Sequence, residues 1–385
     1  MFRIALVLIM TLVPYTFAAN GLDAALVKKA EMSVDKAAKY LVAKQNKNGS
    51  WGPYGGMPEF TSLVCTALVT STSADSAEVK AAIAKGEDYI AQHANEDGSI
   101  WRKSDRGYPN YSTSVSLVAL FLINPEKHKK VILKGREWLK KSQFTDKTAA
   151  NKIDAGGIGY GKGKNVADLS NTQMALEALY LTAAIEKEGV SARDVKSTLE
   201  SFKMADEFLS RCQALPKTND QKWAKSVNGD DIGGFIYSPD RVKVEKDGKT
   251  TDHKVYGSMT YAGLKSMIYA GYMKDDKLNK NDPRVKAAVE WASKHYSVDK
   301  NPGVGTAGLF YYLETFTKAL HAYGEAEIKD ASGKMRNWRA DVINKLISVQ
   351  QEEGYWVNDN GRWMENVPEM VTAFALATMN KAMAK

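Results

Sequence analysis

The sequence predicts an all-α fold, an α/α toroid of about six helical hairpins arranged as inner and outer rings, with a small β-hairpin insertion near residues 236–256. Three observations support this prediction. A turn that combines glycine with a bulky apolar residue recurs six times. An amphipathic helix precedes each turn, and a second, more apolar helix follows it. A unit repeated at this scale is the sequence signature of a repeat architecture.

The turns themselves define the six units. The clearest turn is "QNKNGSW" at 45–51, and "ANEDGSIW" at 94–101 nearly repeats it. The weaker relatives are "GGIGYG" at 156–161, "GGFIY" at 233–237, "NPGVG" at 301–305 and "EEGYW" at 353–356.

The helix before each turn carries apolar residues at i, i+3, i+6 and i+7, which places them on one helical face. These positions are Val34, Ala37, Tyr40 and Leu41 in the first unit and, as a weaker match, Ala340, Ile343, Leu346 and Ile347 in the sixth. Four residues beyond the last position, four of the six units have a glutamine: Gln45, Gln143, Gln213 and Gln351. Charged residues concentrate on these helices, so we expect them to form the outer ring.

The second helix of each unit carries few charges, as "TSVSLVALFLI" at 113–123 illustrates, and should be buried on nearly all sides. One helical pair cannot bury its apolar face alone, so the pairs should stack side by side. If the stack closes, the product is a toroid. The pattern runs without a linker from about residue 22 to 384, so we expect a single domain over residues 19–385.

Residues 1–18 have the layout of a secretory signal peptide, with Arg3, an apolar run from Ile4 to Val13 and small residues at Ala18 and Ala19. We expect cleavage near Ala18. The run is too short to span a bilayer and no later segment is long enough, so a transmembrane helix is not expected. The mature protein should therefore be secreted or periplasmic.

Composition argues against several partners and cofactors. The chain has 53 basic and 45 acidic residues, but the two signs are interspersed, so no nucleic-acid-binding stripe is expected. Cys65 and Cys212 fall in apolar helical patterns, where buried free thiols are expected, although the sequence leaves open whether they pair. The histidines show no ligand spacing. Neither a metal nor another cofactor is predicted.

The glutamine, glycine and tryptophan of these turns resemble the QW repeat of squalene and oxidosqualene cyclases. This likeness places the chain with the terpenoid cyclase and protein prenyltransferase superfamily over nearly its whole mature length. In those families the glutamine ties a helix end and the tryptophan stacks over the neighbouring turn. The resemblance therefore implies a structural clasp made by Gln45, Trp51, Trp101, Gln351 and Trp356. Segments such as "DLSNTQMALEALYL" at 168–181 are also similar to bacterial prenyltransferase and squalene oxidase repeat proteins, a family that names no reaction.

The catalytic groups of those families are not matched. Bacterial triterpene cyclases carry Asp-x-Asp-Asp-Thr at the start of an inner helix, whereas this chain has "DLSNT" at 168–172, with Ser170 in place of an acid. A hydroxyl is too weak an acid to protonate an alkene. The Asp-x-Cys zinc pair of prenyltransferases is also missing, because Leu63 and Ser210 precede the cysteines at that spacing. The resemblance therefore implies the fold but neither chemistry.

Topology locates a candidate site. If helices alternate in direction, all six inner helices begin at one end of the barrel, where their positive dipole ends favour an acidic or hydroxyl-rich ligand. The candidate ligand-binding residues are Asp168, Asn171, Tyr261, Tyr311, Tyr312, Glu314 and Glu365. Asp168 could instead serve as a helix cap. Buried phenols and carboxylates need a partner or a ligand.

Three classes of function stay open, and whether the protein is an enzyme stays open with them. It could bind an apolar, isoprenoid-like small molecule in an aromatic cavity. It could be a polysaccharide lyase or another glycan-active enzyme, or a scaffold that binds a protein. The wall of the central cavity discriminates the first two: Phe, Trp and Met favour an isoprenoid, and Tyr, Glu and Arg favour a glycan.

Overall fold

The computed structural model describes residues 21–103, 107–161, 166–186, 192–244, 250–251 and 254–384. The predicted signal peptide and residues 245–249 of the predicted β-hairpin insertion lie outside these ranges. Across the described ranges, no helix combines the length and the apolar character needed to cross a membrane.

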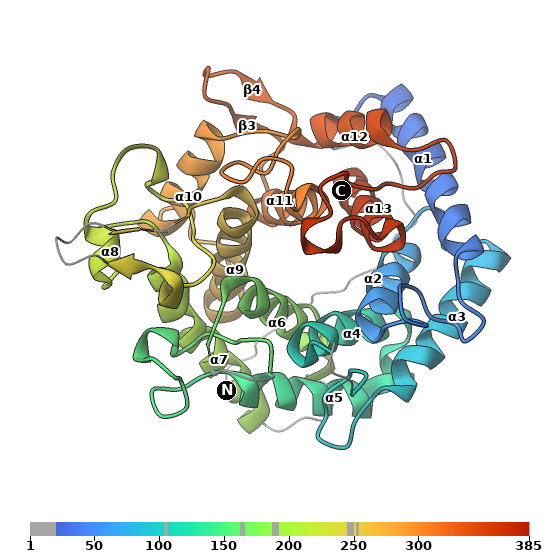
Figure 1. The fold of residues 1–385 in the computed structure, drawn as a ribbon, viewed down its shortest axis with the longest axis horizontal. Helices are drawn as coiled ribbons and strands as arrows, with labels where there is room; N and C mark the ends of the chain where they lie inside the picture. The colour runs from blue at the N-terminus through green and yellow to red at the C-terminus, as the bar shows by residue number, and fades with distance from the viewer. Residues whose placement is uncertain are drawn as a thin grey trace, which may run out of the picture.

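The helices form two concentric rings (Figure 1). The inner ring consists of α2 (Pro58–Val69), α4 (Pro109–Ile123), α6 (Leu169–Leu181), α9 (Gly257–Asp275), α11 (Leu309–Tyr323) and α13 (Pro368–Met383). The outer ring consists of α1 (Ala24–Ala43), α3 (Ala77–Gln92), α5 (Pro125–Ser142), α7 (Ala192–Cys212), α10 (Pro283–Lys294) and α12 (Trp338–Val349). Each inner helix contacts the next, and α13 contacts α2. The predicted all-α toroid is confirmed, and its ring is closed.

Shorter elements decorate the connections. They are α8 (Lys222–Lys225) and the 3-10 turns η1 (Lys152–Asp154), η2 (Ala183–Glu186), η3 (Gly229–Asp231), η4 (Pro239–Arg241) and η5 (Arg362–Met364). β1 (Lys243–Val244) pairs antiparallel with β2 (Thr250–Thr251), inside the predicted insertion. A second hairpin, β3 (Ile328–Lys329) with β4 (Met335–Arg336), was not predicted from the sequence.

Burial follows the predicted division between the rings. In α9 every residue from Gly257 to Tyr269 is buried, whereas α1 buries only one stripe that includes Val34 and Leu41. The continuous apolar runs thus produce helices enclosed on all sides, and the amphipathic ones cover them. Cys65 and Cys212 are both buried and free.

Glutamine side chains fasten neighbouring units together. Gln45 Nε2 donates to the carbonyl of Gly49 in its own turn at 2.9 Å and to that of Ala82 in the next outer helix at 2.8 Å. The same pair of bonds runs from Gln143 to Gly156 and Ser201, and from Gln213 to Gly233 and Arg284. Each amide thus bridges a carbonyl of its own turn and a carbonyl of the neighbouring outer helix.

In the sixth unit this amide belongs to Gln350, not to the predicted Gln351. Gln350 Nε2 donates to Gly354 O at 2.9 Å and to Ser33 O at 3.0 Å, and its Oε1 accepts from the Ser33 hydroxyl at 2.7 Å. Gln351 is exposed and bonds Tyr355 through its backbone. Because Ser33 lies in the first helix, the Gln350 clasp joins the last unit to the first.

The tryptophans explain the one-residue correction. Trp51 Nε1 donates to Leu41 O at 2.7 Å, and Trp356 Nε1 donates to Leu346 O at 2.8 Å. Leu346 therefore corresponds to Leu41, and the predicted register of the sixth unit, which equated Ile347 with Leu41, is wrong by one residue. Trp101 does not occupy the clasp position, since its Nε1 donates to Ser99 Oγ within its own turn.

A threonine on the inner helix completes the clasp, and the sequence reasoning missed it. Its hydroxyl accepts the backbone N–H of the turn residue that packs beneath it, at 2.9 to 3.1 Å. The pairs are Trp51 with Thr61, Ile100 with Thr113, Ile158 with Thr172, Phe235 with Thr260, and Trp356 with Thr372. The second unit thus places Ile100, not Trp101, where the first places Trp51. A threonine recurring in the first turns of the inner helices was the available signal.

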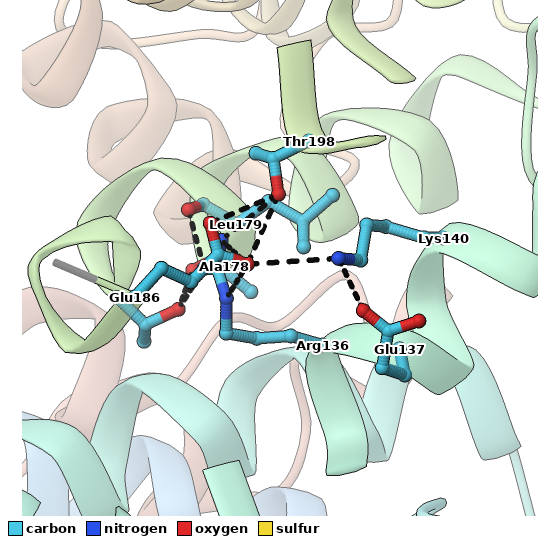
Figure 2. A network of polar contacts seen from close by, with 8 residues as sticks. Arg136, Glu137, Lys140, Ala178, Leu179, Glu186 and Thr198 are labelled. Atoms are coloured by element: carbon cyan, nitrogen blue, oxygen red, sulfur yellow. Dashed lines mark hydrogen bonds and ion pairs between the residues drawn. The ribbon is translucent and has the colours of Figure 1, made fainter. Parts of the chain in front are cut away.

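A buried ion pair joins the two rings at the opposite end of the inner helix α6 (Figure 2). Arg136 of α5 has no exposed surface and donates to Glu186 Oε1 through Nε at 2.9 Å. Its Nη1 donates to Leu179 O at 2.6 Å, and the Thr198 hydroxyl of α7 donates to Glu186 at 3.1 Å. Because these partners come from three helices and η2, the pair fixes the spacing of α5, α6 and α7.

Candidate functional site

The loops that lead into the inner helices meet at one end of the barrel, which we call the mouth. In the part of the chain that the structure describes, they are residues 52–57, 101–103 with 107–108, 159–161 with 166–168, 237–244 with 250–251 and 254–256, 301–308, and 357–367. Hydrogen bonds join these loops, or the helix starts they lead into, around the ring: Arg102 to Tyr54 O, Asn110 N to Tyr160 O, Leu169 N to Tyr237 O, Gly257 N to Pro302 O, and Asn358 Nδ2 to Thr306 O. The helix N-termini are therefore gathered as the topology predicted.

Asp168 and Asn171 lie at the mouth and form hydrogen bonds with one another. Asp168 caps α6, accepting the backbone N–H of Asn171 at 2.7 Å and its side-chain amide at 2.8 Å. Asn110 of α4 donates to the remaining Asn171 oxygen at 3.0 Å. Burial raises the pKa of Asp168 to about 6 despite these bonds. The geometry favours the capping interpretation, and ligand binding by this pair stays a prediction.

Glu365 also acts as a cap. Its Oε1 accepts the backbone N–H of Tyr311 at 2.9 Å, and its Oε2 accepts from Asn358 at 2.6 Å. The N-cap residue of α11 is Gly308, which has no side chain to accept from the first N–H groups of the helix, so Glu365 does so from the next unit. Burial raises the pKa of Glu365 to about 7.

Tyr311 lies across the barrel axis, just inside the mouth. Its hydroxyl is 3.0 Å from Ser170 Oγ and accepts from Gln173 Nε2 at 3.1 Å, both on α6. The helices α11 and α6 are separated in the ring by α9, so this contact spans the lumen. Burial raises the pKa of the Tyr311 phenol.

Tyr261 and Tyr312 do not reach the mouth, contrary to the expectation from topology. The Tyr312 hydroxyl donates to Ser297 O, beyond the end of outer helix α10, at 2.7 Å. The Tyr261 ring packs edge-on against Tyr312 and Phe316, at centroid distances of 5.8 and 5.0 Å. Both phenols therefore lie between the inner and the outer ring of helices. Both residues come early in an inner helix, which predicted a place near the mouth, but the sequence pattern did not determine in which direction their side chains point.

Glu314 lies deeper on the axis, in a cluster of opposite charges. Lys318 Nζ is 2.8 Å from Glu314 Oε1 and 2.8 Å from Glu177 Oε1, and Lys265 also pairs with Glu177. Burial raises the pKa of Glu177, but Lys265 and Lys318 outweigh burial and lower it to about 2. Burial lowers the pKa of Lys265. The sequence reasoning missed Glu177 and both lysines, because each looked like a lone charge in an apolar helix.

A cavity of about 30 Å³ adjoins this charge cluster. Glu177, Glu314, Lys318 and Ser114 line it together with small or aliphatic side chains. Glu314 Oε2 and Ser114 Oγ are buried there and lack a hydrogen-bond partner among the described residues. The volume admits about two water molecules, which could satisfy these atoms.

Exposed aromatic side chains surround the mouth. Tyr54, Tyr108, Tyr160 and Trp363 have 59, 45, 41 and 45% of their surface exposed. Tyr54 and Trp363 both adopt a left-handed backbone with φ of 59°. A bulky residue in this conformation is strained, and such strain concentrates at functional sites. None of these four aromatics is among the candidate ligand-binding residues predicted from the sequence. The glycines beside Tyr54 and before Trp363 were the available signal.

The aromatic side chains of the mouth contact one another. The Tyr108 and Tyr160 rings are 5.3 Å apart, and the Tyr160 hydroxyl is 3.1 Å from that of Tyr237. On the other side of α9, Tyr256 and Trp363 stack at 6.4 Å with an interplanar angle of 13°. We call Tyr54, Tyr108, Tyr160, Tyr237, Tyr256 and Trp363 the aromatic rim. No group of three metal-ligating side chains occurs within the described ranges.

Solved structures of two enzyme groups share this architecture. A variant of the type II terpene cyclase MstE from Scytonema, in complex with geranylgeranyl dihydroxybenzoate, is 14% identical with a TM-score of 0.55, covering 94% of this chain and 99% of that one. An inactive α-1,6-mannanase of glycoside hydrolase family 76 from Salegentibacter, in complex with α-1,6-mannotriose, is 8% identical with a TM-score of 0.59, covering 92% and 99%. A family 76 glycoside hydrolase from a bovine Bacteroides thetaiotaomicron strain is 10% identical with a TM-score of 0.59, covering 92% and 78%.

These likenesses confirm the predicted toroid and its kinship in fold with terpene cyclases. At such low identity they show the fold alone. No family model matches the chain, and no curated protein matches it.

Proposed function

We propose that the protein is exported and binds a glycan chain at the mouth of the toroid. The observation that carries this proposal is the aromatic rim, with Tyr54 and Trp363 exposed on strained backbone. The face of an aromatic ring is electron-rich and accepts the C–H groups of a sugar ring that lies flat against it. Hydroxyls such as those of Tyr160 and Tyr237 can exchange hydrogen bonds with sugar hydroxyls.

The cavity that adjoins the charge cluster does not suit an isoprenoid-like ligand. A small-molecule site occupies roughly 300 Å³ or more and is lined mainly by apolar groups. The axial cavity has about 30 Å³ and is flanked by Glu177, Glu314 and Lys318. Placing hydrocarbon against these groups would strip water from charges without giving them new partners. Binding across the mouth avoids this cost. One solved neighbour was bound to mannotriose, so the fold can hold a glycan in another protein.

Titration calorimetry of the mature protein with neutral and acidic oligosaccharides tests the proposal. Tyr54→Asn and Trp363→Asn remove the rings, and asparagine tolerates the left-handed backbone, so the fold should persist. Each change should weaken binding about ten-fold, which corresponds to roughly 1.4 kcal/mol. Tyr323→Ala, at the opposite end of α11, is the matched control and should leave affinity unchanged.

Two results would overturn the proposal. One is the absence of binding to any glycan in a broad panel by the folded protein. The other is recovery of a hydrophobic ligand by native mass spectrometry, together with unchanged glycan affinity of both asparagine variants.

A further inference from the structure

We infer that the glycan bound at the mouth is anionic, with carboxylate or sulfate groups that contact Arg102, Arg241 and Arg362. This inference rests on the proposed function and names its ligand class. Three features of the mouth support it: the excess of basic side chains, the orientation of the arginines, and the way the acids are used.

Basic side chains dominate the surface of the mouth loops. In their described parts, Lys103, Arg241, Lys254 and Arg362 are exposed and Arg102 is half-buried. The acids at the surface of the same loops are the exposed Asp359 and the half-buried Asp240, which accepts a hydrogen bond from Asn151. The inner-helix N-termini add their positive dipole ends to this excess. The local field therefore attracts an anionic chain.

Two of the arginines stack on aromatic rings of the rim, beside the surface that would hold a sugar. The Arg241 guanidinium is 4.6 Å from the centre of the Tyr237 ring, and that of Arg362 is 4.6 Å from the Trp363 ring. Stacking uses the face of a guanidinium and leaves the N–H donors at its edge, in a fork that matches a carboxylate or sulfate. Neither arginine forms an ion pair with a described residue.

Arg102 is held differently. Its Nη1 donates to Tyr54 O and Gly56 O at 3.0 Å each, so the side chain braces the strained loop that presents Tyr54. Its Nε and Nη2 hydrogens are not used by these bonds. Arg102 is thus positioned to contact an anion lying on the Tyr54 ring.

The other acids of the mouth are withdrawn from its surface. Asp168 and Glu365 are buried and cap helices, and Glu59 in the first turn of α2 is 4% exposed. Burial raises the pKa of all three carboxyls, and it raises that of Glu365 to about 7, so Glu365 carries only part of a charge near neutral pH. The hydrogen bonds of Asp168 and Glu365 are made to backbone N–H groups and asparagine amides rather than to the arginines.

The experiment measures the affinity of the full mature chain for a polyuronate, a sulfated galactan and a neutral mannan of similar length at low salt. We expect at least one anionic polymer to bind ten-fold or more tightly than the neutral one, and that preference to fall as salt is raised. The double change Arg241→Gln with Arg362→Gln should abolish the preference, so that the anionic polymers bind no more tightly than the mannan does to the same variant. The polyuronate and sulfated arms distinguish the two anionic groups.

The matched control is Lys28→Gln with Lys29→Gln, which removes the same charge from the exposed face of α1. Equal loss of preference in this control would indicate diffuse attraction and overturn the inference. Equal affinity for duplex DNA would do the same. If neutral and anionic glycans bind equally, the inference fails and the proposed function stands. If no glycan binds at all, both fail.

Discussion

Replacing Gln350 with alanine should loosen the junction between the sixth unit and the first. The side chain makes three hydrogen bonds: one to Gly354 O in its own turn, at 2.9 Å, and two that join the sixth unit to the first, with Ser33 O and Ser33 Oγ at 3.0 and 2.7 Å. At about 1 kcal/mol for each bond, the substitution should cost about 3 kcal/mol of unfolding free energy. With an unfolding entropy of about 2 cal/mol/K per residue, a chain of this size should lose about 4 °C in Tm.

The neighbouring Gln351 provides the matched control. It is exposed, and no side-chain hydrogen bond of it is described, so Gln351→Ala should change the unfolding free energy by less than about 0.5 kcal/mol. Chemical unfolding followed by far-ultraviolet circular dichroism measures both variants against the wild type. An equal effect of the two substitutions, or a larger one at Gln351, would refute the one-residue register assigned to the sixth unit.

Three further outcomes are expected. Arg136→Met leaves Glu186 buried without its main partner and should cost about 3 to 5 kcal/mol. Lys140→Met removes a 3.6 Å contact with Glu186 and the ion pair with the half-exposed Glu137, and should cost much less in the same unfolding assay. Thr172→Val leaves the Ile158 N–H unpaired and should cost about 1 to 3 kcal/mol, and an equal cost for Thr66→Val, which faces the axial cavity, would contradict that reason. Glu365 has a pKa of about 7 in the folded protein, against an ordinary value of 4.5, so the folded state binds the carboxyl proton more tightly than the unfolded state does. This difference stabilises the fold below about pH 4.5, and the stabilisation is lost as the pH rises to 7. Glu365→Gln cannot ionise and should therefore gain roughly 3 kcal/mol relative to the wild type between those pH values, which unfolding curves at pH 4.5 and 7.5 would measure.

The repeat made most of the architecture predictable. Apolar periodicity separates outer from inner helices because solvent reaches one face of the first and none of the second. The glycine turns were predictable because the backbone there is left-handed and tightly packed. Gly156 has φ of 89°, and a Cβ on it would lie 2.0 Å from Met204 O. Where two adjacent residues are both apolar, as Leu346 and Ile347 are in the sixth unit, apolar periodicity cannot decide which of them occupies the repeat position.

The candidate site was less predictable, for a different reason. The position of a residue along an inner helix sets its depth below the mouth, but it does not show in which direction the side chain points. Tyr311 faces the barrel axis, whereas its neighbour Tyr312 faces the outer ring of helices. The pairing of Glu177 with Lys265 and Lys318 depends on three helices converging, which no local pattern encodes. The aromatic rim lies in loops, where periodicity carries no information.

Closure of the ring also means that the chain could begin in any of its units. Gly21 O accepts from Asn337 and Ala384 O from Arg339, so the two ends of the described chain meet at the start of the same helix, α12. A closed array has no terminal unit that must be sealed by a special sequence. A circular permutant, with these ends joined by a short linker and new ends cut into another unit's turn, should therefore assemble the same barrel.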